Sequence, residues 1–189
     1  MFYKQNPKLM RFKYLYLSYF LLLINFSLVF TQPSQFKAHG IGGGGSFYSP
    51  AVNPNNSKEI FMVPDMSDLY HSLDGGNSWS VVSFTSFVAD PSKSPAVQFT
   101  ETPNLLYSTT TNWVTENTLT VKSTDGGTTW KPITTDPTSG NGVWITIANL
   151  QNANQVIVSD YNNLYFSNDE GRTFINNGKA FCFNISLFI

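Results

Sequence analysis

The chain has 189 residues, 12% of them charged and 15% aromatic, and its net charge at pH 7 is −1. This length suits one domain, and the near-neutral charge lacks the basic excess typical of nucleic-acid binding. A single cysteine, Cys182, excludes an internal disulfide. His39 and His71 have no zinc-ligand spacing, and the glycines at 42–45 lack the Gly-Lys-Ser/Thr ending of a phosphate loop. We therefore expect no metal, no cofactor and no nucleic-acid partner.

Residues 1–31 predict a secretory signal peptide. Four basic residues precede or open the apolar run 14–30, and a polar stretch follows it. The alternative is an uncleaved signal anchor, because the run is nearly long enough to span a bilayer. Both interpretations place the rest of the chain in the secretory lumen or outside the cell, and cleavage would make the protein secreted; we expect no other membrane-spanning segment. Without residues 1–31 the chain keeps seven basic and 12 acidic residues, a net charge of −5. Asn55 begins a glycosylation sequon in a Pro/Asn-rich turn, which suits an exported protein.

Three blocks then share the pattern Ser-x-Asp-x-Gly-x-x-aromatic. We call them box 1 (72–79), box 2 (123–130) and box 3 (167–174); their starts lie 51 and 44 residues apart. Repeats of this length suggest propeller blades. The defining residues are Ser72, Asp74, Gly76 and Trp79 in box 1, Ser123, Asp125, Gly127 and Trp130 in box 2, and Ser167, Asp169, Gly171 and Phe174 in box 3.

Each repeat predicts four short strands, because residues alternate between apolar and polar and turn residues separate the runs. The expected strands are 47–52, 59–63, 68–72 and 79–84, then 96–100, 105–109, 118–123 and 130–133, then 143–148, 155–159, 164–167 and 173–175. The fold class is therefore all-β: a propeller of four-stranded antiparallel blades. The propeller region is 32–176, with blades at about 40–90, 91–138 and 139–176, followed by an atypical apolar tail at 177–189.

The boxes themselves predict structure rather than chemistry. Asp-Gly-Gly between two strands forms a hairpin turn, in which glycine supplies a positive φ and the Ser and Asp side chains bond the turn's own backbone. We expect Asp74, Asp125 and Asp169 to fold these turns. The aromatic residue that ends each box is expected to fill the space between neighbouring sheets.

The three boxes resemble the Asp-boxes, or BNR repeats, of sialidases, sortilin-type receptors and the xyloglucanases of glycoside hydrolase family 74. This resemblance implies a propeller. Sialidases hold their substrate with three arginines, whereas Arg172 is the one arginine beyond the signal segment, so an intact sialidase site is excluded.

The opening blade is similar to that of the xyloglucanases, in the Gly-rich stretch 42–54 and the following "VPDMSDLYHS". That resemblance places the family's catalytic aspartate on Asp65, although Pro64 and 66–68 depart from the family's Thr and Ile-Gly-Gly. Glycoside hydrolysis uses two carboxyl groups, and in the family the second comes from a downstream propeller, which we do not expect in this chain. The alternative role for Asp65 is a structural contact at a strand end, which Asp160 repeats in the third blade.

Polysaccharide or glycan binding is the other hypothesis. Exposed aromatic side chains stack on flat apolar surfaces such as sugar faces, and Trp113 and Tyr48 are the predicted binding residues. Tyr70, Trp144 and Tyr161 are further candidates. Three blades do not close a ring, so we expect an incomplete propeller that self-associates through open blade edges and is not active alone. The predicted function is a secreted propeller fragment similar to xyloglucanases or, alternatively, a non-catalytic module that binds carbohydrate or protein.

Overall fold

The computed structural model describes residues 45–65, 68–83, 85, 88–89, 92, 96–112, 115 and 117–179. The chain divides into the units Met1–Ala38 and His39–Ile189, and all the described residues belong to the second unit. The expected signal segment, Trp113 and most of the expected tail lie outside the described residues. Within the described part, no helix has both the length and the apolar character needed to cross a membrane.

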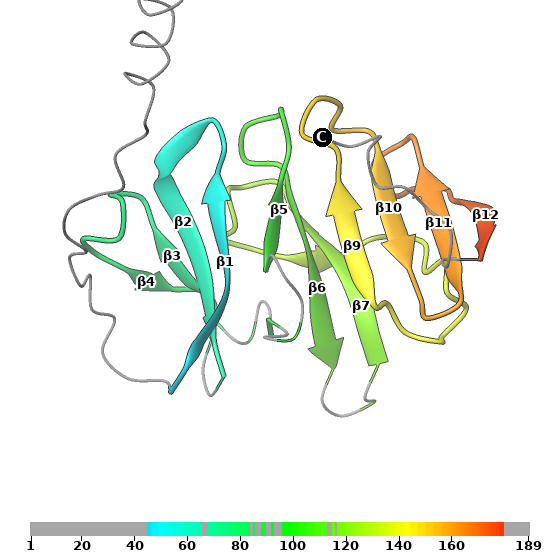
Figure 1. The fold of residues 1–189 in the computed structure, drawn as a ribbon, viewed down its shortest axis with the longest axis horizontal. Coiled ribbons are helices and arrows are strands. Elements are labelled where there is room, and N and C mark those ends of the chain that lie inside the picture. Colours follow the sequence, from blue (N-terminus) through cyan, green and yellow to red (C-terminus); the bar gives the residue numbers. More distant parts are fainter. Residues whose placement is uncertain are drawn as a thin grey trace, which may run out of the picture. The chain divides into compact units, whose positions relative to one another are not determined.

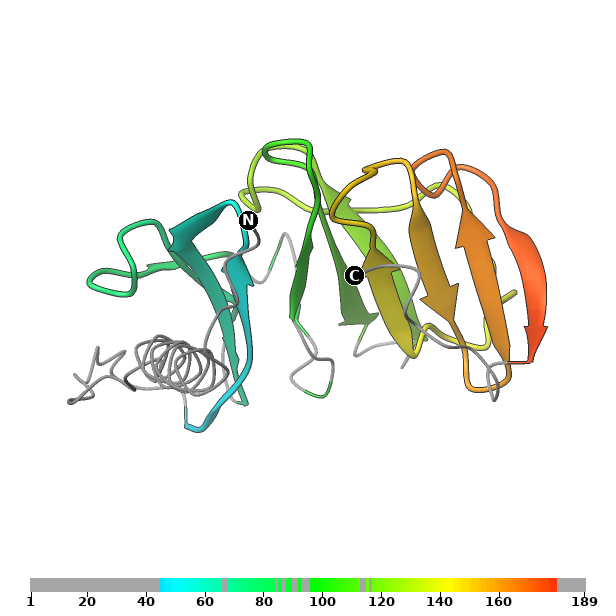
Figure 2. The same cartoon turned by 45° about the horizontal axis from the view of Figure 1, so that its top comes forward.

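In the described part of the chain, twelve strands form three four-stranded antiparallel sheets, as the sequence predicts. Blade 1 comprises β1 to β4, blade 2 β5 to β8 and blade 3 β9 to β12, and the strands within each blade follow chain order (Figures 1 and 2). The bounds are Phe47–Asn53, Asn56–Pro64, Tyr70–Ser72 and Ser80–Val81, then Val97–Phe99, Leu106–Asn112, Asn117–Ser123 and Lys131–Pro132, then Ile145–Ala148, Val156–Ser159, Asn163–Ser167 and Ile175–Lys179.

All twelve expected strands are confirmed, but three of them extend three or more residues further than the sequence indicated. Strand β2 begins at Asn56, β6 runs on to Asn112, and β12 runs on to Lys179 into the expected tail. These extensions consist mainly of polar residues with no clear alternation, so neighbouring-strand pairing rather than the local pattern sets their ends. The pairing of β6 with β7 continues to Asn112 and Asn117, which form the last pair of that hairpin.

The core lies between the blades. One cluster of buried apolar residues joins blades 1 and 2, and it includes Phe61 and Trp130. A second cluster joins blades 2 and 3, and it includes Tyr107 and Val156. Because each blade buries one face against the next, the burial of apolar area holds neighbouring blades together.

All three boxes form the same hydrogen-bonded turn. In box 2, the Ser123 hydroxyl donates to Asp125 Oδ1 at 2.8 Å and accepts from the Gly127 amide at 2.8 Å. The two oxygens of Asp125 accept from the amide and hydroxyl of Thr129 at 2.9 and 2.6 Å. Trp130 Nε1 donates to the Gly127 carbonyl at 2.9 Å. Boxes 1 and 3 repeat the serine and aspartate bonds at 2.6 to 3.0 Å.

Each later box rests on the blade before it. A Cβ atom added to Gly127 of box 2 would lie 2.7 Å from the Phe61 ring of blade 1. A Cβ atom added to Gly171 of box 3 would lie 3.4 Å from Ile133, which follows the last strand of blade 2. Trp79 of box 1 and Phe174 of box 3 are half-buried, whereas Trp130 of box 2 is only 5% exposed. Trp130 belongs to the cluster between blades 1 and 2, and Phe174 packs against the cluster between blades 2 and 3.

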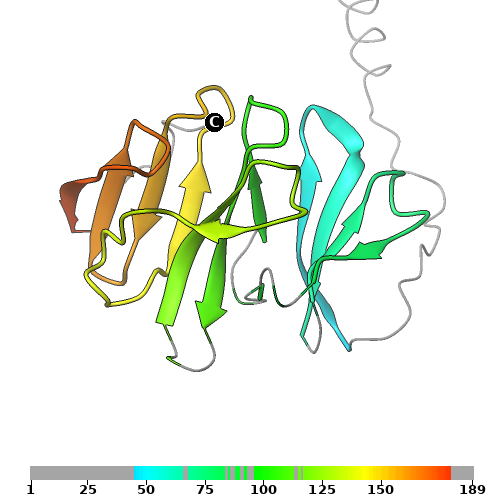
Figure 3. The same cartoon turned by 180° about the vertical axis from the view of Figure 1, so that it is seen from behind.

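Blades 2 and 3 also share a buried polar contact and a covering connection. Thr146 Oγ1 lies 3.1 Å from Thr109 Oγ1 and 2.8 Å from Thr120 Oγ1, and all three threonines are buried. The connection from β8 to β9 passes across blade 3, as the view from behind shows (Figure 3). Thr135 in this connection donates its hydroxyl proton to the Arg172 carbonyl at 2.7 Å. These bonds fix how blade 3 sits on blade 2.

We expect stability to fall between pH 4 and pH 2, because the box aspartates are ionised in the turns. Hydrogen bonds from the hydroxyl and amide of Ser78 lower the pKa of Asp74 from 3.8 to about 2, and those of Thr173 do the same for Asp169. A lowered folded-state pKa stabilises the fold above the unfolded value, and this stabilisation is lost as pH falls toward the folded value. Urea unfolding measured from pH 5 downward tests this; the Asp74→Asn variant should show a shallower pH dependence, and an unchanged dependence would contradict the assignment.

Candidate functional site

The antiparallel order brings one end of every blade's first three strands together. At this end the first strand begins, the second ends and the third begins, and we call it the entry end. Strands β1 and β9 run in the same direction in Figure 1, opposite to β2, β6 and β10. Tyr48 and Asp65 therefore share the entry end of blade 1, and Trp144 and Tyr161 share the entry end of blade 3.

A groove of about 430 Å³ lies at the entry end of blades 2 and 3. It is built from three segments: Thr115 with the start of β7, the connection into β9, and the residue two places beyond the end of β10. The described residues of its lining carry amide, hydroxyl and aromatic groups, and none of them has a charged side chain. We call it the aromatic groove, and its lining residues are Thr115, Asn117, Thr118, Gly140, Asn141, Gly142, Val143, Trp144 and Tyr161.

Trp144 and Tyr161 form an exposed aromatic pair in this groove. Their ring centroids lie 4.4 Å apart with planes tilted by 40°, and the residues are 43% and 67% exposed. The Trp144 amide donates to the Ser159 carbonyl at 2.7 Å, which anchors its backbone to the end of β10. Two large aromatic surfaces on anchored backbones form a platform for a flat apolar ligand face.

Asp160 fixes the turn that presents Tyr161. Its carboxylate accepts hydrogen bonds from the amides of Asn162 and Asn163 at 2.7 and 2.6 Å and from the Tyr165 hydroxyl at 3.0 Å. Burial opposes ionisation of Asp160, but these hydrogen bonds outweigh it and hold its pKa below the usual value. Asp160 thus holds the turn while the neighbouring Tyr161 faces solvent.

Asp65 occupies a different environment from Asp160. It is exposed directly after β2, and its amide donates to the Ser46 carbonyl at 3.0 Å. Gly45 has φ +82°, and a Cβ atom there would collide with the Asp65 carboxylate. The glycine at this blade entry therefore gives the Asp65 side chain room that no other residue would give.

Strand register only partly supports the equivalence of Asp65 and Asp160. Counting back from the box serines matches the two residues, but Met62 pairs with Tyr70 while Val158 pairs with Tyr165. Asp65 lies three residues after Met62, and the residue three places after Val158 is Tyr161, so strand pairing matches Asp65 with Tyr161. Blade 1 thus has one more residue than blade 3 between these paired positions of its second and third strands. Because of this residue, Asp65 and Asp160 do not occupy equivalent places in their blades.

The other predicted site residues lie apart from the groove or outside the described residues. Tyr48 is 45% exposed at the start of β1, and Asn55 is exposed in the turn after β1, where its amide donates to Asn53 Oδ1 at 2.9 Å. Trp113 lies outside the described residues. Within the described part of the chain, no group of three or more His, Cys, Asp or Glu side chains could hold a metal ion.

Neither the protein-family models nor the curated proteins contain a match to this chain. Solved structures do match. YCF48 from Cyanidioschyzon merolae superposes with a TM-score of 0.55 at 16% identity over 74% of this chain and 39% of its own. A YCF48 structure bound to D1 peptide gives 0.52 at 19% identity, over 72% and 40%. A GH74 xyloglucanase from Xanthomonas campestris gives 0.50 at 17% identity, over 76% and 22%.

The described residues form three blades of a β-propeller. The twelve strands in three antiparallel sheets and these superpositions together support this conclusion. The chain spans less than half of YCF48 and about a fifth of the xyloglucanase. Identities of this size establish the fold and leave the chemistry to the residues of the site.

Sequence reasoning named both aromatic residues of the groove but did not place them together. Trp144 and Tyr161 are 17 positions apart in the sequence and meet because β9 and β10 are an antiparallel pair. The signal was available: Trp144 lies near the start of the expected strand 143–148 and Tyr161 follows the expected strand 155–159, so antiparallel pairing places both at the same blade end. The groove itself could not be predicted, because the connection 133–144 contributes most of its wall.

Proposed function

We propose that this chain is a secreted, non-catalytic propeller module that binds a neutral polysaccharide in the aromatic groove. The supporting observation is the exposed Trp144–Tyr161 pair in a groove whose described lining residues carry no charged side chain. Aromatic rings contact the apolar faces of sugar rings, while amide and hydroxyl groups match the sugar hydroxyls. The likeness of the boxes to the Asp-boxes of xyloglucanases makes a β-linked glucan such as xyloglucan the first ligand to test.

The lining of the groove argues for binding rather than hydrolysis. Glycoside hydrolysis normally places two carboxyl groups on opposite sides of the scissile bond. None of the nine described residues that line the groove carries a carboxyl group. We therefore expect these residues to hold a sugar chain without cleaving it.

Replacing Trp144 or Tyr161 with alanine should weaken xyloglucan-oligosaccharide binding about fivefold each, since one aromatic contact contributes about 1 kcal/mol. Isothermal titration calorimetry with the full chain measures this. Leu73→Ala is the control, because Leu73 is 65% exposed in box 1 and lies outside the groove. Equal affinities for all three variants and the unaltered chain would rule out the groove as the binding site.

A second candidate function is glycoside hydrolysis through Asp65. The observation that favours it is the carboxylate of Asp65, which is exposed and lies against Gly45 at the entry end of blade 1. An assay of reducing ends released from xyloglucan distinguishes the two functions. Turnover that disappears in Asp65→Asn, while binding persists, would replace the non-catalytic proposal with the hydrolytic one.

Protein binding is the remaining alternative, and YCF48, whose solved structure holds a D1 peptide, shares the fold. A site for the terminal carboxylate of a peptide would need a cation to pair with it, and none of the described residues that line the groove is a cation. Binding of peptides but not of oligosaccharides, lost in Trp144→Ala, would favour this alternative.

A further inference from the structure

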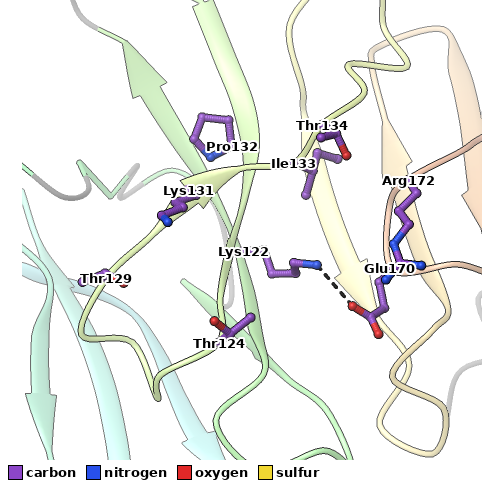
Figure 4. A pocket seen from close by; sticks show the side chains of 9 residues that line it. All are labelled: Lys122, Thr124, Thr129, Lys131, Pro132, Ile133, Thr134, Glu170 and Arg172. Atoms are coloured by element: carbon purple, nitrogen blue, oxygen red, sulfur yellow. Dashed lines mark hydrogen bonds and ion pairs between the residues drawn. The ribbon is translucent and has the colours of Figure 1, made fainter.

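A second cavity, of about 260 Å³, lies between blades 2 and 3 beside box 3 (Figure 4). Lys122 of β7, Lys131 of β8 and Arg172 of box 3 line it, together with Glu170 and several threonines. We call it the basic pocket. It shares no lining residue with the aromatic groove.

Positive charge is concentrated in this pocket although the chain as a whole is slightly acidic. Between residues 45 and 179 the described chain has five basic residues, and three of them line the pocket. Lys122 and Lys131 are directly opposite partners on β7 and β8. Like charges in directly opposite positions destabilise a pair of strands, so a bound anion would reduce the repulsion between these two lysines.

Glu170 is the one acidic residue among the described residues that line the pocket, and its backbone conformation is unusual. Its Oε2 lies 3.2 Å from Lys122 Nζ, which links blade 3 to blade 2. Its φ is +59°, at a box position where boxes 1 and 2 have Gly75 and Gly126. Among the described residues, neither Lys131 nor Arg172 has an ion pair. Glu170 therefore neutralises one of the three cations and leaves two.

A buried hydroxyl group belongs to the residue that pairs with Lys122 on the neighbouring strand. Tyr107 is the direct partner of Lys122 on β6 and β7 and is fully buried, and its hydroxyl has no hydrogen-bond partner among the described residues. Burial raises the pKa of Tyr107, and the charges of Glu170 and Arg172 both act on this group. The phenol therefore remains protonated and keeps an unused donor close to two residues of the pocket.

We propose that the basic pocket is an oxyanion-binding site, in which a carboxylate, sulfate or phosphate group displaces Glu170 from Lys122 and is also held by Lys131 and Arg172. A guanidinium group binds such anions through two parallel hydrogen bonds, and an ammonium group adds a point charge. The anion is either a free inorganic ion or an acidic group on a sugar chain. The site is separate from the proposed neutral-polysaccharide groove and does not depend on it.

The full chain is titrated calorimetrically with inorganic phosphate and, separately, with oligogalacturonate at constant ionic strength. Arg172→Gln should weaken binding about tenfold, since it removes charge-assisted hydrogen bonds. Glu170→Gln should strengthen binding about fivefold, because a competing negative charge is removed a few ångströms from the anion. Lys58→Gln, a loss of one charge in blade 1, should leave the affinity unchanged.

Saturable binding of both probes with this pattern of variants supports a site for acidic sugar chains, and binding of phosphate alone supports a site for a free oxyanion. The gain in Glu170→Gln keeps the proposal testable even if Arg172→Gln folds poorly. Loss of binding in Lys58→Gln equal to that in Arg172→Gln would show that net charge alone matters and would overturn the proposal. Absence of saturable binding of either probe at millimolar concentration would overturn it as well.

Discussion

Replacing Gly127 with alanine is expected to lower the free energy of unfolding by about 3 kcal/mol, as overpacking and backbone strain add together. The added Cβ would lie 2.7 Å from Phe61 Cζ and 2.9 Å from Cε1. Phe61 is fully buried at the contact of blades 1 and 2, so its ring has no free space to move into. Gly127 also has φ +86°, which an alanine adopts at a cost.

Gly75 provides the matched control for this substitution. It lies in box 1 with φ +75°, and a Cβ atom there would have nothing within 4 Å. Gly75→Ala should therefore lose only about 1 kcal/mol, the backbone contribution. Urea unfolding of both variants measures the difference, and Phe61→Leu should recover part of the Gly127→Ala loss. Equal losses in Gly75→Ala and Gly127→Ala would show that box 2 does not rest on blade 1 as described.

The blades could be predicted because the sequence patterns that indicate their turns and strands lie within short stretches of the chain. Each box contains its own turn, with a serine and an aspartate two positions apart that bond the following backbone. The strands on either side alternate with period two, so the sequence alone indicates where they begin and end to within a few residues. Box 3 shows that the turn tolerates change: Glu170 keeps the left-handed conformation that Gly75 and Gly126 have in the other boxes.

The two pockets could not be predicted, because their walls come from segments distant in the sequence. The aromatic groove joins Asn117 to Tyr161, and the basic pocket joins Lys122 to Arg172 across the boundary of two blades. One local signal for the basic pocket was present in the repeat: a glutamate at 170, where the other boxes have glycine. A residue other than glycine at a positive-φ position where the other repeats have glycine indicates that its side chain makes a contact outside the repeat.

Replacing Ser123 with alanine is expected to destabilise the protein by about 2 kcal/mol, because a buried donor loses its acceptor. The Ser123 hydroxyl is 1% exposed and accepts from the amides of Gly127 and Asp125 at 2.8 and 3.3 Å. Alanine would leave the buried Gly127 amide unsatisfied at the contact with Phe61. It would also remove one of the hydrogen bonds that lower the pKa of Asp125, so the loss should be larger at neutral pH than near pH 3.

Thr124→Ala is the adjacent control for the serine substitution. Thr124 is exposed next to Ser123, and its replacement should change the free energy of unfolding by no more than about 0.5 kcal/mol. Ser72→Ala tests what determines the loss of unfolding free energy: the hydrogen bonds within the box, or the position of the box between two blades. Box 1 has the same serine bonds but no preceding blade among the described residues. A smaller loss in Ser72→Ala than in Ser123→Ala would therefore show that the box serine acts chiefly by holding the turn glycine against the neighbouring blade, whereas equal losses would assign the stabilisation to the turn alone.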